Sequence, residues 1–129
     1  MSEKVKAPRV LCASCPYRKD VPSGIWEQSE YDKLPKYDGE TWEQAGALFM
    51  CHLRDGCLCG GWLACHDPQE LLALRLNHGV DPSVFKYRTC TPVFESGAAA
   101  RAHGIKDIAN PKPRARKMIA GLMKTKDKR

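Results

Sequence analysis

Thiol side chains dominate the chemistry that this sequence offers. Six of its seven cysteines fall in two short stretches, residues 12–15 and residues 51–66, and the second stretch also carries two histidines. Thiolates and imidazoles this close in sequence can converge on one ion at little cost in loop-closure entropy. The two clusters therefore predict a bound metal ion that staples the fold.

A disulfide scaffold is the main alternative for seven cysteines in a small protein. The count is odd, the candidates are clustered, and residues 1–6 lead into no apolar stretch that would make a signal peptide. We therefore expect a cytoplasmic protein with no membrane contact, whose thiols bind metal rather than form disulfides. Buried thiols without a metal are the third interpretation, and the isolated Cys90 is expected to be a small buried hydrophobe.

The metal ligands are predicted from spacing. A structural zinc site takes four ligands in a tetrahedron and commonly draws one pair from a Cys-x2-Cys turn, which Cys12 and Cys15 supply. The other pair must come from the second cluster, which offers more candidates than places. The predicted ligands are Cys12, Cys15, Cys51 and Cys59, with four further possible ligands or supporting side chains: His52, Cys57, Cys65 and His66.

Two glycines decide between neighbouring thiols in the second cluster. Only one of Cys57 and Cys59 is expected to face the metal. Gly60 and Gly61 favour Cys59, because glycines let the backbone approach a sulfur closely and donate amide hydrogen bonds to it. Trp62 is expected to pack over the sulfurs, so these three residues are predicted to support the site.

A [4Fe–4S] cluster is the alternative cofactor, because it also needs four thiolates. The chain loosely resembles the small actinobacterial iron–sulfur transcription factors, which have four cysteines, a Gly/Trp turn and a basic tail. Those proteins place three cysteines close together as Cys-x2-Cys-x5-Cys, whereas 35 residues lie between Cys15 and Cys51 here. Zinc is therefore the expected metal.

Three motifs occur together between about residues 10 and 80. They are Cys-x2-Cys-Pro-Tyr-Arg-Lys-Asp-x-Pro-Ser-Gly-x-Trp at 12–26, Phe-x-Cys-His at 49–52 and Cys-x-Gly-Trp-x2-Cys-His at 59–66. As a set they resemble an uncharacterised family of small proteins from actinobacteria and their phages. The resemblance implies a cytoplasmic, metal-binding protein and no particular activity. Cys57 and the basic tail lie outside this pattern.

Positive charge is concentrated at the C-terminus. Residues 112–129 hold eight basic side chains and one acidic side chain, which gives this segment a charge of +7. The whole chain has a net charge of +6, so residues 1–111, with 13 basic and 14 acidic side chains, carry −1. We expect a metal-binding domain over 1–110 and a basic amphipathic tail over 111–129, set off as an appendage by two prolines. Contacts to phosphates would let this tail bind DNA or RNA. The predicted contact residues are Lys112, Arg114, Arg116, Lys117, Lys124 and Lys126.

The fold class predicted is small and mainly α, with short helices around a metal-stapled, Cys-rich loop. Thr41 and Gln44 fit a capping box for a helix that would carry Cys51 at its end. Asp67 with the proline after it marks the start of a second helix, closed near residue 79, and Ser96 fits the cap of a third over 97–103. The three tryptophans are expected in the core.

Function is expected to be binding. No phosphate-cradling glycine loop, Gly-x-Ser-x-Gly elbow or His-x3-His pair occurs in the sequence, so enzymatic activity is the least favoured interpretation. The preferred hypothesis is a nucleic-acid-associated or regulatory protein whose metal orders the fold. The alternatives are a protein-interaction module that acts on a host factor, and an iron–sulfur redox sensor.

Overall fold

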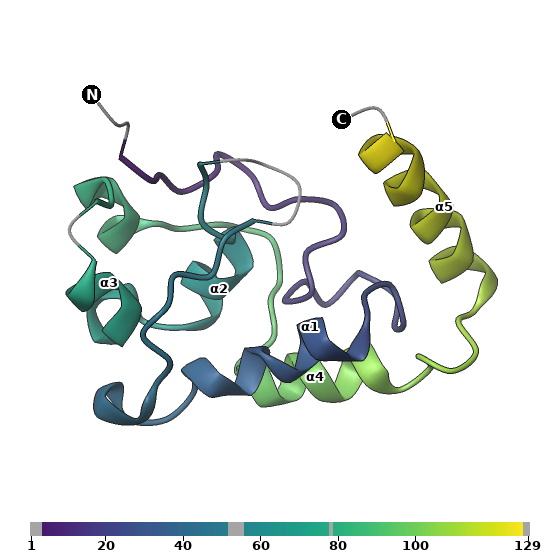
Figure 1. Cartoon of the computed structure of the whole chain (residues 1–129), viewed down its shortest axis with the longest axis horizontal. Coiled ribbons are helices and arrows are strands. Elements are labelled where there is room, and N and C mark those ends of the chain that lie inside the picture. Colours follow the sequence, from purple (N-terminus) through teal and green to yellow (C-terminus); the bar gives the residue numbers. More distant parts are fainter. Residues whose placement is uncertain (1–3, 52–55, 78, 128–129) are drawn as a thin grey trace.

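The computed structural model describes residues 4–51, 56–77 and 79–127, with side chains as far as residue 123. These residues form a small, mainly helical protein, as the sequence predicts (Figure 1). The α-helices of this part of the chain are α1 (Gln28–Asp32), α2 (Gly60–Cys65), α3 (Leu72–Leu76), α4 (Gly97–Ile105) and α5 (Pro113–Asp127). The 3-10 helices are η1 (Leu34–Tyr37), η2 (Thr41–Glu43), η3 (Pro68–Glu70) and η4 (Pro82–Lys86).

Isolated β-bridges, rather than a sheet, tie the loops of the described residues together. Met50 pairs with Leu58 in an antiparallel bridge, and the N-terminal segment joins the same ladder through Lys6. Another bridge pairs Arg18 with Val93. The loop cluster that carries the second set of cysteines is therefore held by backbone hydrogen bonds rather than by a long helix.

Aromatic rings fill the centre of the core. Trp62 on α2 is fully buried and meets Tyr37 edge-on at 5.3 Å and Phe49 in a stacked arrangement at 6.3 Å between ring centroids. Tyr17, also fully buried, meets Phe49 edge-on at 5.9 Å. Buried aromatic pairs of this kind add stabilisation beyond the area they remove from water. The core thus joins the segment around residue 17 to α2.

Helix capping agrees with the sequence in some places and not in others. The Ser96 side chain accepts the Ala99 amide at 3.0 Å and begins α4, as predicted. Asp67 accepts the Gln69 amide at 3.0 Å, but the element it caps is the 3-10 helix η3, and α3 begins only after an extended residue. The second predicted helix is thus divided in two.

The capping box predicted at Thr41 is wrong. Its hydroxyl donates to the carbonyl of Glu70 at 2.8 Å, and Gln44 accepts the Leu72 amide at 3.0 Å, so both side chains bond across the fold instead of along a helix. Only the short η2 forms, and Trp42 on it is 77% exposed. The expectation of a buried tryptophan is therefore corrected at this position.

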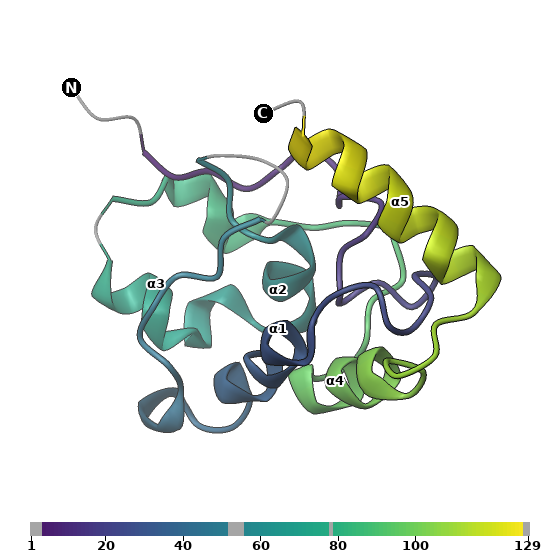
Figure 2. The same ribbon diagram turned by 45° about the vertical axis from the view of Figure 1, so that its right-hand side comes forward.

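Two further expectations are corrected by exposure and packing. Cys90 is exposed, not buried. The tail forms the predicted helix, α5, but Ala115 on it is fully buried in a cluster with Val21 and Ile25. Figures 1 and 2 show α5 lying along the side of the body next to the segment before α1, so this helix is packed rather than appended.

No helix in the described part of the chain has the length and apolar character needed to cross a membrane.

Candidate metal centre

The first pair of predicted ligands sits on a tight turn. The Cys15 amide donates to the Cys12 carbonyl at 3.2 Å, and the Arg18 amide donates to the Cys15 carbonyl at 3.0 Å. Both thiols are buried, with Cys15 only 1% exposed. We call residues 12–15 the knuckle. This turn leaves the sulfurs of Cys12 and Cys15 on the core side of the chain.

Backbone amides point at both knuckle sulfurs. The Ser14 amide bonds to the Cys12 sulfur and the Tyr17 amide to the Cys15 sulfur, and each bond lowers the pKa of its thiol. An amide donor favours the charged thiolate, which is the form that binds metals. These contacts therefore prepare the knuckle for negative charge on sulfur.

The second pair comes from the ladder around the bridge of Met50 and Leu58. The Cys51 amide donates to the Cys57 carbonyl and the Cys59 amide to the Phe49 carbonyl, both at 2.9 Å. This pairing places Cys51 opposite Cys57 and Cys59 opposite Phe49, on either side of the bridge, so Cys51 and Cys59 lie near each other although seven residues lie between them in the sequence. Cys59 is 2% exposed and directly precedes α2.

The four predicted ligands are in contact as a chain of thiols. Cys12 hydrogen-bonds to both Cys15 and Cys51, and the Cys15 and Cys59 sulfurs share a hydrogen bond at 3.6 Å. None of the seven cysteines, all of which the structure describes, forms a disulfide. Within the described residues, however, no three or more side chains of His, Cys, Asp or Glu already surround a point as metal ligands do. The thiols are linked in pairs rather than closed around a centre.

The protonated form of these linked thiols is favoured overall. The hydrogen bond to Cys15, followed by burial, raises the pKa of Cys12. The pKa of Cys15 is lowered by its bond with Cys12, but the bond to Cys59 and burial together raise it well above the ordinary thiol value. A metal ion that binds here must therefore displace protons from sulfur.

Gly61 provides the close approach that the sequence predicts. A Cβ at this position would lie 2.5 Å from the Cys15 sulfur and 2.6 Å from the Tyr17 Cβ, both too close for a real side chain. Gly60 instead lies against Leu11, the neighbour of the knuckle. The amides that bond to the knuckle sulfurs come from Ser14 and Tyr17, so these two glycines provide space.

Trp62 supports the site as part of the aromatic core. Its ring lies among aromatic side chains, against Tyr37 and Phe49, in the core cluster that also contains Cys12, Cys15 and Cys59. Its indole Nε1 is buried and has no hydrogen-bond partner among the described residues. Trp62 therefore holds α2, and with it the residues on either side, by packing.

Burial, and not the direction of the side chain, distinguishes Cys59 from Cys57 as a candidate ligand. Residues two positions apart in an extended segment share a face, so alternation alone cannot select one of them. Cys59 is buried and bonds to Cys15, whereas Cys57 is half-buried. Cys65, at the end of α2, is also half-buried, and burial raises its pKa to about 12.

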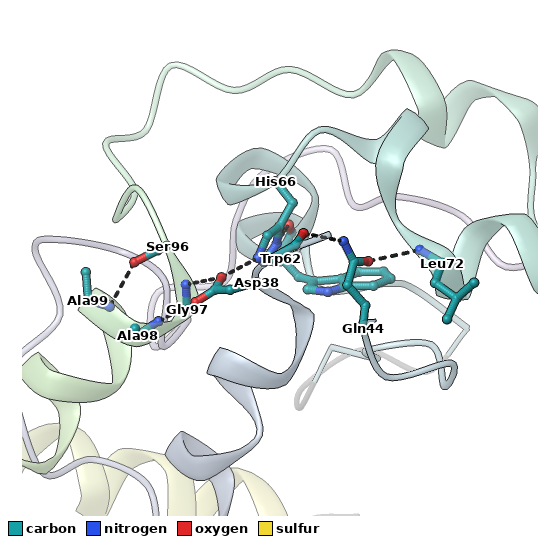
Figure 3. A network of polar contacts seen from close by, with 10 residues as sticks. Asp38, Gln44, Trp62, His66, Leu72, Ser96, Gly97, Ala98 and Ala99 are labelled. Atoms are coloured by element: carbon teal, nitrogen blue, oxygen red, sulfur yellow. Dashed lines mark hydrogen bonds and ion pairs between the residues drawn. The ribbon is translucent and has the colours of Figure 1, made fainter. Parts of the chain in front are cut away.

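His66 is occupied by other partners. Its Nδ1 lies 2.9 Å from the Trp62 carbonyl and its Nε2 lies 3.0 Å from Asp38 Oδ1, so neither ring nitrogen is directed at a thiol (Figure 3). The Asp38 carboxylate also accepts the amides of Gly97 at 2.8 Å and Ala98 at 2.9 Å. His66 therefore connects the end of α2 to the start of α4. His52 lies outside the described residues.

Sequence reasoning missed two parts of this arrangement. Asp38 has no local signal, because it caps a helix that begins 59 positions later. The contact of Arg18 with the knuckle is the other: its guanidinium donates to the Cys12 carbonyl at 3.3 Å and also pairs with Asp20 at 2.8 Å. The hydrogen bond to Asp20 raises the pKa of Arg18. Its place three residues after the knuckle was the available signal.

The predicted nucleic-acid residues lie on α5 or just before it. Lys112, Arg114, Arg116 and Lys117 are exposed. Arg114 donates to the Asp20 carbonyl at 2.7 Å and so also fastens the helix to the body, whereas Arg116 donates to the Pro111 carbonyl at 2.8 Å, just before its own helix. The side chains of the remaining two predicted residues, Lys124 and Lys126, lie beyond those that the structure describes.

The fold and the site define a small, mainly helical protein built around a cluster of buried thiols. The chain belongs to a family of unknown function, DUF6283, and its match covers residues 7–120. This region crosses the boundary predicted at residue 110 and includes the first half of α5. No curated protein and no solved structure matches the chain.

Proposed function

We propose that this protein binds one tetrahedral metal ion, zinc, through Cys12, Cys15, Cys51 and Cys59, and that the ion stabilises the fold. The observation that carries the proposal is the chain of contacts that links all four thiols, three of them buried, with amides already directed at two of the sulfurs. Four sulfurs from two separate turns are the donor set that structural zinc prefers.

The spacing of the sulfurs favours one ion over a cluster. Zinc–sulfur bonds of about 2.3 Å at tetrahedral angles place neighbouring sulfurs about 3.8 Å apart. Cys15 and Cys59 lie at 3.6 Å already. A [4Fe–4S] cluster binds each thiolate to a different iron, so its four sulfurs stand further apart than those around a single ion. Small side-chain rotations, rather than an expansion of the core, would complete a zinc site.

Metal binding would supply stability that the rest of the chain lacks. Helices α1 to α3 have five or six residues each, which is too short for independent stability. The four thiols join the knuckle to the ladder of residues 49–59, and zinc–thiolate linkage contributes about 10 to 16 kcal/mol to folding in small zinc domains at neutral pH. The proposed role of the ion is therefore structural.

The test is metal analysis on protein purified without oxygen. We expect a colourless preparation with one zinc per chain and no iron. A brown preparation with visible absorption and several irons per chain would replace the zinc site with an iron–sulfur redox sensor. Protein that carries no metal and does not take up added zinc would remove the proposal.

Binding of nucleic acid in the cytoplasm is the biological role that we propose for this zinc protein. The supporting observation is the row of exposed cations Lys112, Arg114, Arg116 and Lys117, next to a body of nearly neutral charge. Log affinity for duplex DNA should fall with log salt by about 0.9 for each phosphate neutralised. A salt titration of the full chain against Lys112→Gln/Lys117→Gln measures this slope, which should be shallower in the variant. No binding at low salt would favour a protein partner.

A further inference from the structure

The backbone carbonyls of the knuckle are bonded by two side chains from the segment that follows it. Arg18 Nη1 donates to the Cys12 carbonyl at 3.3 Å, and Trp26 Nε1 donates to the Ser14 carbonyl at 2.9 Å. Both contacts hold the turn on which the first two thiols sit. If the knuckle changes shape, the Arg18 and Trp26 side chains must therefore move to keep these hydrogen bonds.

Arg18 also reaches α5. Its guanidinium forms two hydrogen bonds of 2.8 Å with the carboxylate of Asp20, and the backbone carbonyl of the same Asp20 accepts Arg114 Nη2 of α5 at 2.7 Å. The path from the Cys12 carbonyl to α5 thus consists of hydrogen bonds through Asp20, which itself lies on the surface.

Trp26 makes the second connection through apolar contact. It packs against both the main core and a smaller cluster in which Val21, Ile25 and the fully buried Ala115 meet. Three side chains from α5 complete that smaller cluster: Met118, Ile119 and Leu122. In Figures 1 and 2 the segment between the knuckle and α1 lies between the body and α5. The helix therefore docks on residues whose positions depend on the knuckle.

We propose that metal binding at the four thiols and docking of α5 are thermodynamically coupled, so that each favours the other. This inference rests on the proposed zinc site and names its regulation. Closing the thiols around an ion fixes the knuckle, and the fixed knuckle holds Arg18 and Trp26 where α5 needs them. Loss of the ion loosens the docked helix and uncovers its apolar face, next to the basic side chains proposed to contact phosphates.

The coupling should be partial, because the middle of the segment has its own anchor. The Ser23 hydroxyl donates to the Gly104 carbonyl of α4 at 2.9 Å and accepts the Asp107 amide at 2.8 Å. This anchor does not depend on the thiols. We therefore expect a factor of about ten, within the usual range for coupled sites, rather than complete release.

Because thermodynamic coupling is reciprocal, the inference can be tested by changing α5 and measuring zinc affinity. If the ion favours docking, a variant that cannot dock must bind the ion more weakly by the same factor. Ala115→Asp places a charge in the buried cluster, which is costly without a partner. Ala120→Asp makes the same change at an exposed position of the same helix and is the matched control.

A gentler pair covers the possibility that Ala115→Asp disturbs folding. Arg114→Ala removes the bond to the Asp20 carbonyl, whereas Arg116→Ala removes the same charge from a side chain that bonds only near the start of its own helix, to Pro111 and Asn110. Equal charge loss in the two variants separates docking from general electrostatics.

The experiment is competition for zinc between each full-length protein and a chromophoric chelator, with amide exchange of residues 115–119 followed with and without zinc. We expect the zinc affinity of Ala115→Asp to be about tenfold lower than that of the native chain, and that of Arg114→Ala to be lowered by less. Both control variants should bind zinc with native affinity. In the native chain, the amides of α5 should exchange faster when zinc is removed. Equal affinity in all chains, with unchanged exchange, would overturn the coupling while leaving the zinc site. A native chain that binds no zinc would overturn both.

Discussion

Cys15 is the thiol with the least freedom. It is 1% exposed, its sulfur accepts the Tyr17 amide, and it contacts both Cys12 and Cys59. Gly61 closes the remaining side, because a Cβ there would overlap the Cys15 sulfur. The position of this sulfur is therefore restricted by the backbone of Tyr17 and Gly61 and by two other thiols.

Gly61→Ala should weaken both the fold and metal retention. The added methyl group would lie 2.5 Å from the Cys15 sulfur, so something must shift, and overpacking of a core typically costs about 1 to 3 kcal/mol. Gly79→Ala is the control, because a Cβ there has no neighbour within 4 Å. Chelator competition and urea unfolding measure the two effects. Equal behaviour of both variants would show that the space beside Cys15 is unimportant.

Ionisation of the Cys65 thiol should lower the free energy of unfolding at alkaline pH. Burial, with a smaller effect from Asp38, raises its pKa from 9.0 to about 12 in the folded protein, so the fold favours the neutral thiol. This contribution is fully present below pH 9.0 and is lost as the pH rises through about 12. Melting temperatures between these limits should fall less steeply in Cys65→Ala than in the native chain. Parallel curves for the two proteins would contradict the assignment.

At the scale of single residues, the sequence indicated which thiols lie near one another, while their role as metal ligands stays a prediction. Cysteines of two separate clusters were expected to meet, and the structure brings Cys12, Cys15, Cys51 and Cys59 into contact. Their spacing was informative because the Cys-x2-Cys turn is local. The role of His66 was not predictable, because its partner Asp38 lies on a distant loop.

At the scale of helices and turns, caps decide where short helices begin. Asp38 accepts the first two amides of α4 and also bonds to His66, so one carboxylate satisfies groups from two elements (Figure 3). Orphan amides at a helix start need such acceptors. The end of α2 and the start of α4 are therefore held together by a single, half-buried network of hydrogen bonds.

Asp38→Ala should cost clearly more stability than Asp32→Ala. The first change removes acceptors for Gly97, Ala98 and His66, and the loss of a helix cap alone typically costs about 0.5 to 2 kcal/mol. Asp32 instead forms a half-exposed ion pair with Arg101, a kind of contact that contributes about 0 to 1 kcal/mol. Urea unfolding of both variants gives the comparison. A larger loss for Asp32→Ala would mean that the Asp38 network contributes little.

The sequence predicted the start of a helix correctly where the hydrogen-bond partner of the capping side chain is local. Ser96 begins α4 because the amide that its hydroxyl accepts lies only three residues away, on Ala99. Thr41 and Gln44 have the spacing of a capping box, but their side chains bond to Glu70 and Leu72, so tertiary partners replaced the local ones. The same competition explains why 3-10 turns stand where longer helices were expected.

At the scale of the whole molecule, α5 is part of the fold. The sequence marks it as an appendage through its charge and the prolines before it, yet Ala115 is fully buried against Val21 and Ile25. Charge density describes the outer face of this helix, whereas packing is decided by the few apolar residues on the other face. The family match to residue 120 agrees with a helix that belongs to the body.

The central claim is that four particular thiols hold one zinc ion. The most direct measurement is zinc per chain, by native mass spectrometry, in the native protein and in seven single Cys→Ser variants. We expect one zinc in the native chain and in the Cys57, Cys65 and Cys90 variants, and a large loss of zinc and of melting temperature in the Cys12, Cys15, Cys51 and Cys59 variants. Retention of zinc by the Cys59→Ser protein, together with its loss from Cys57→Ser or Cys65→Ser, would contradict the account.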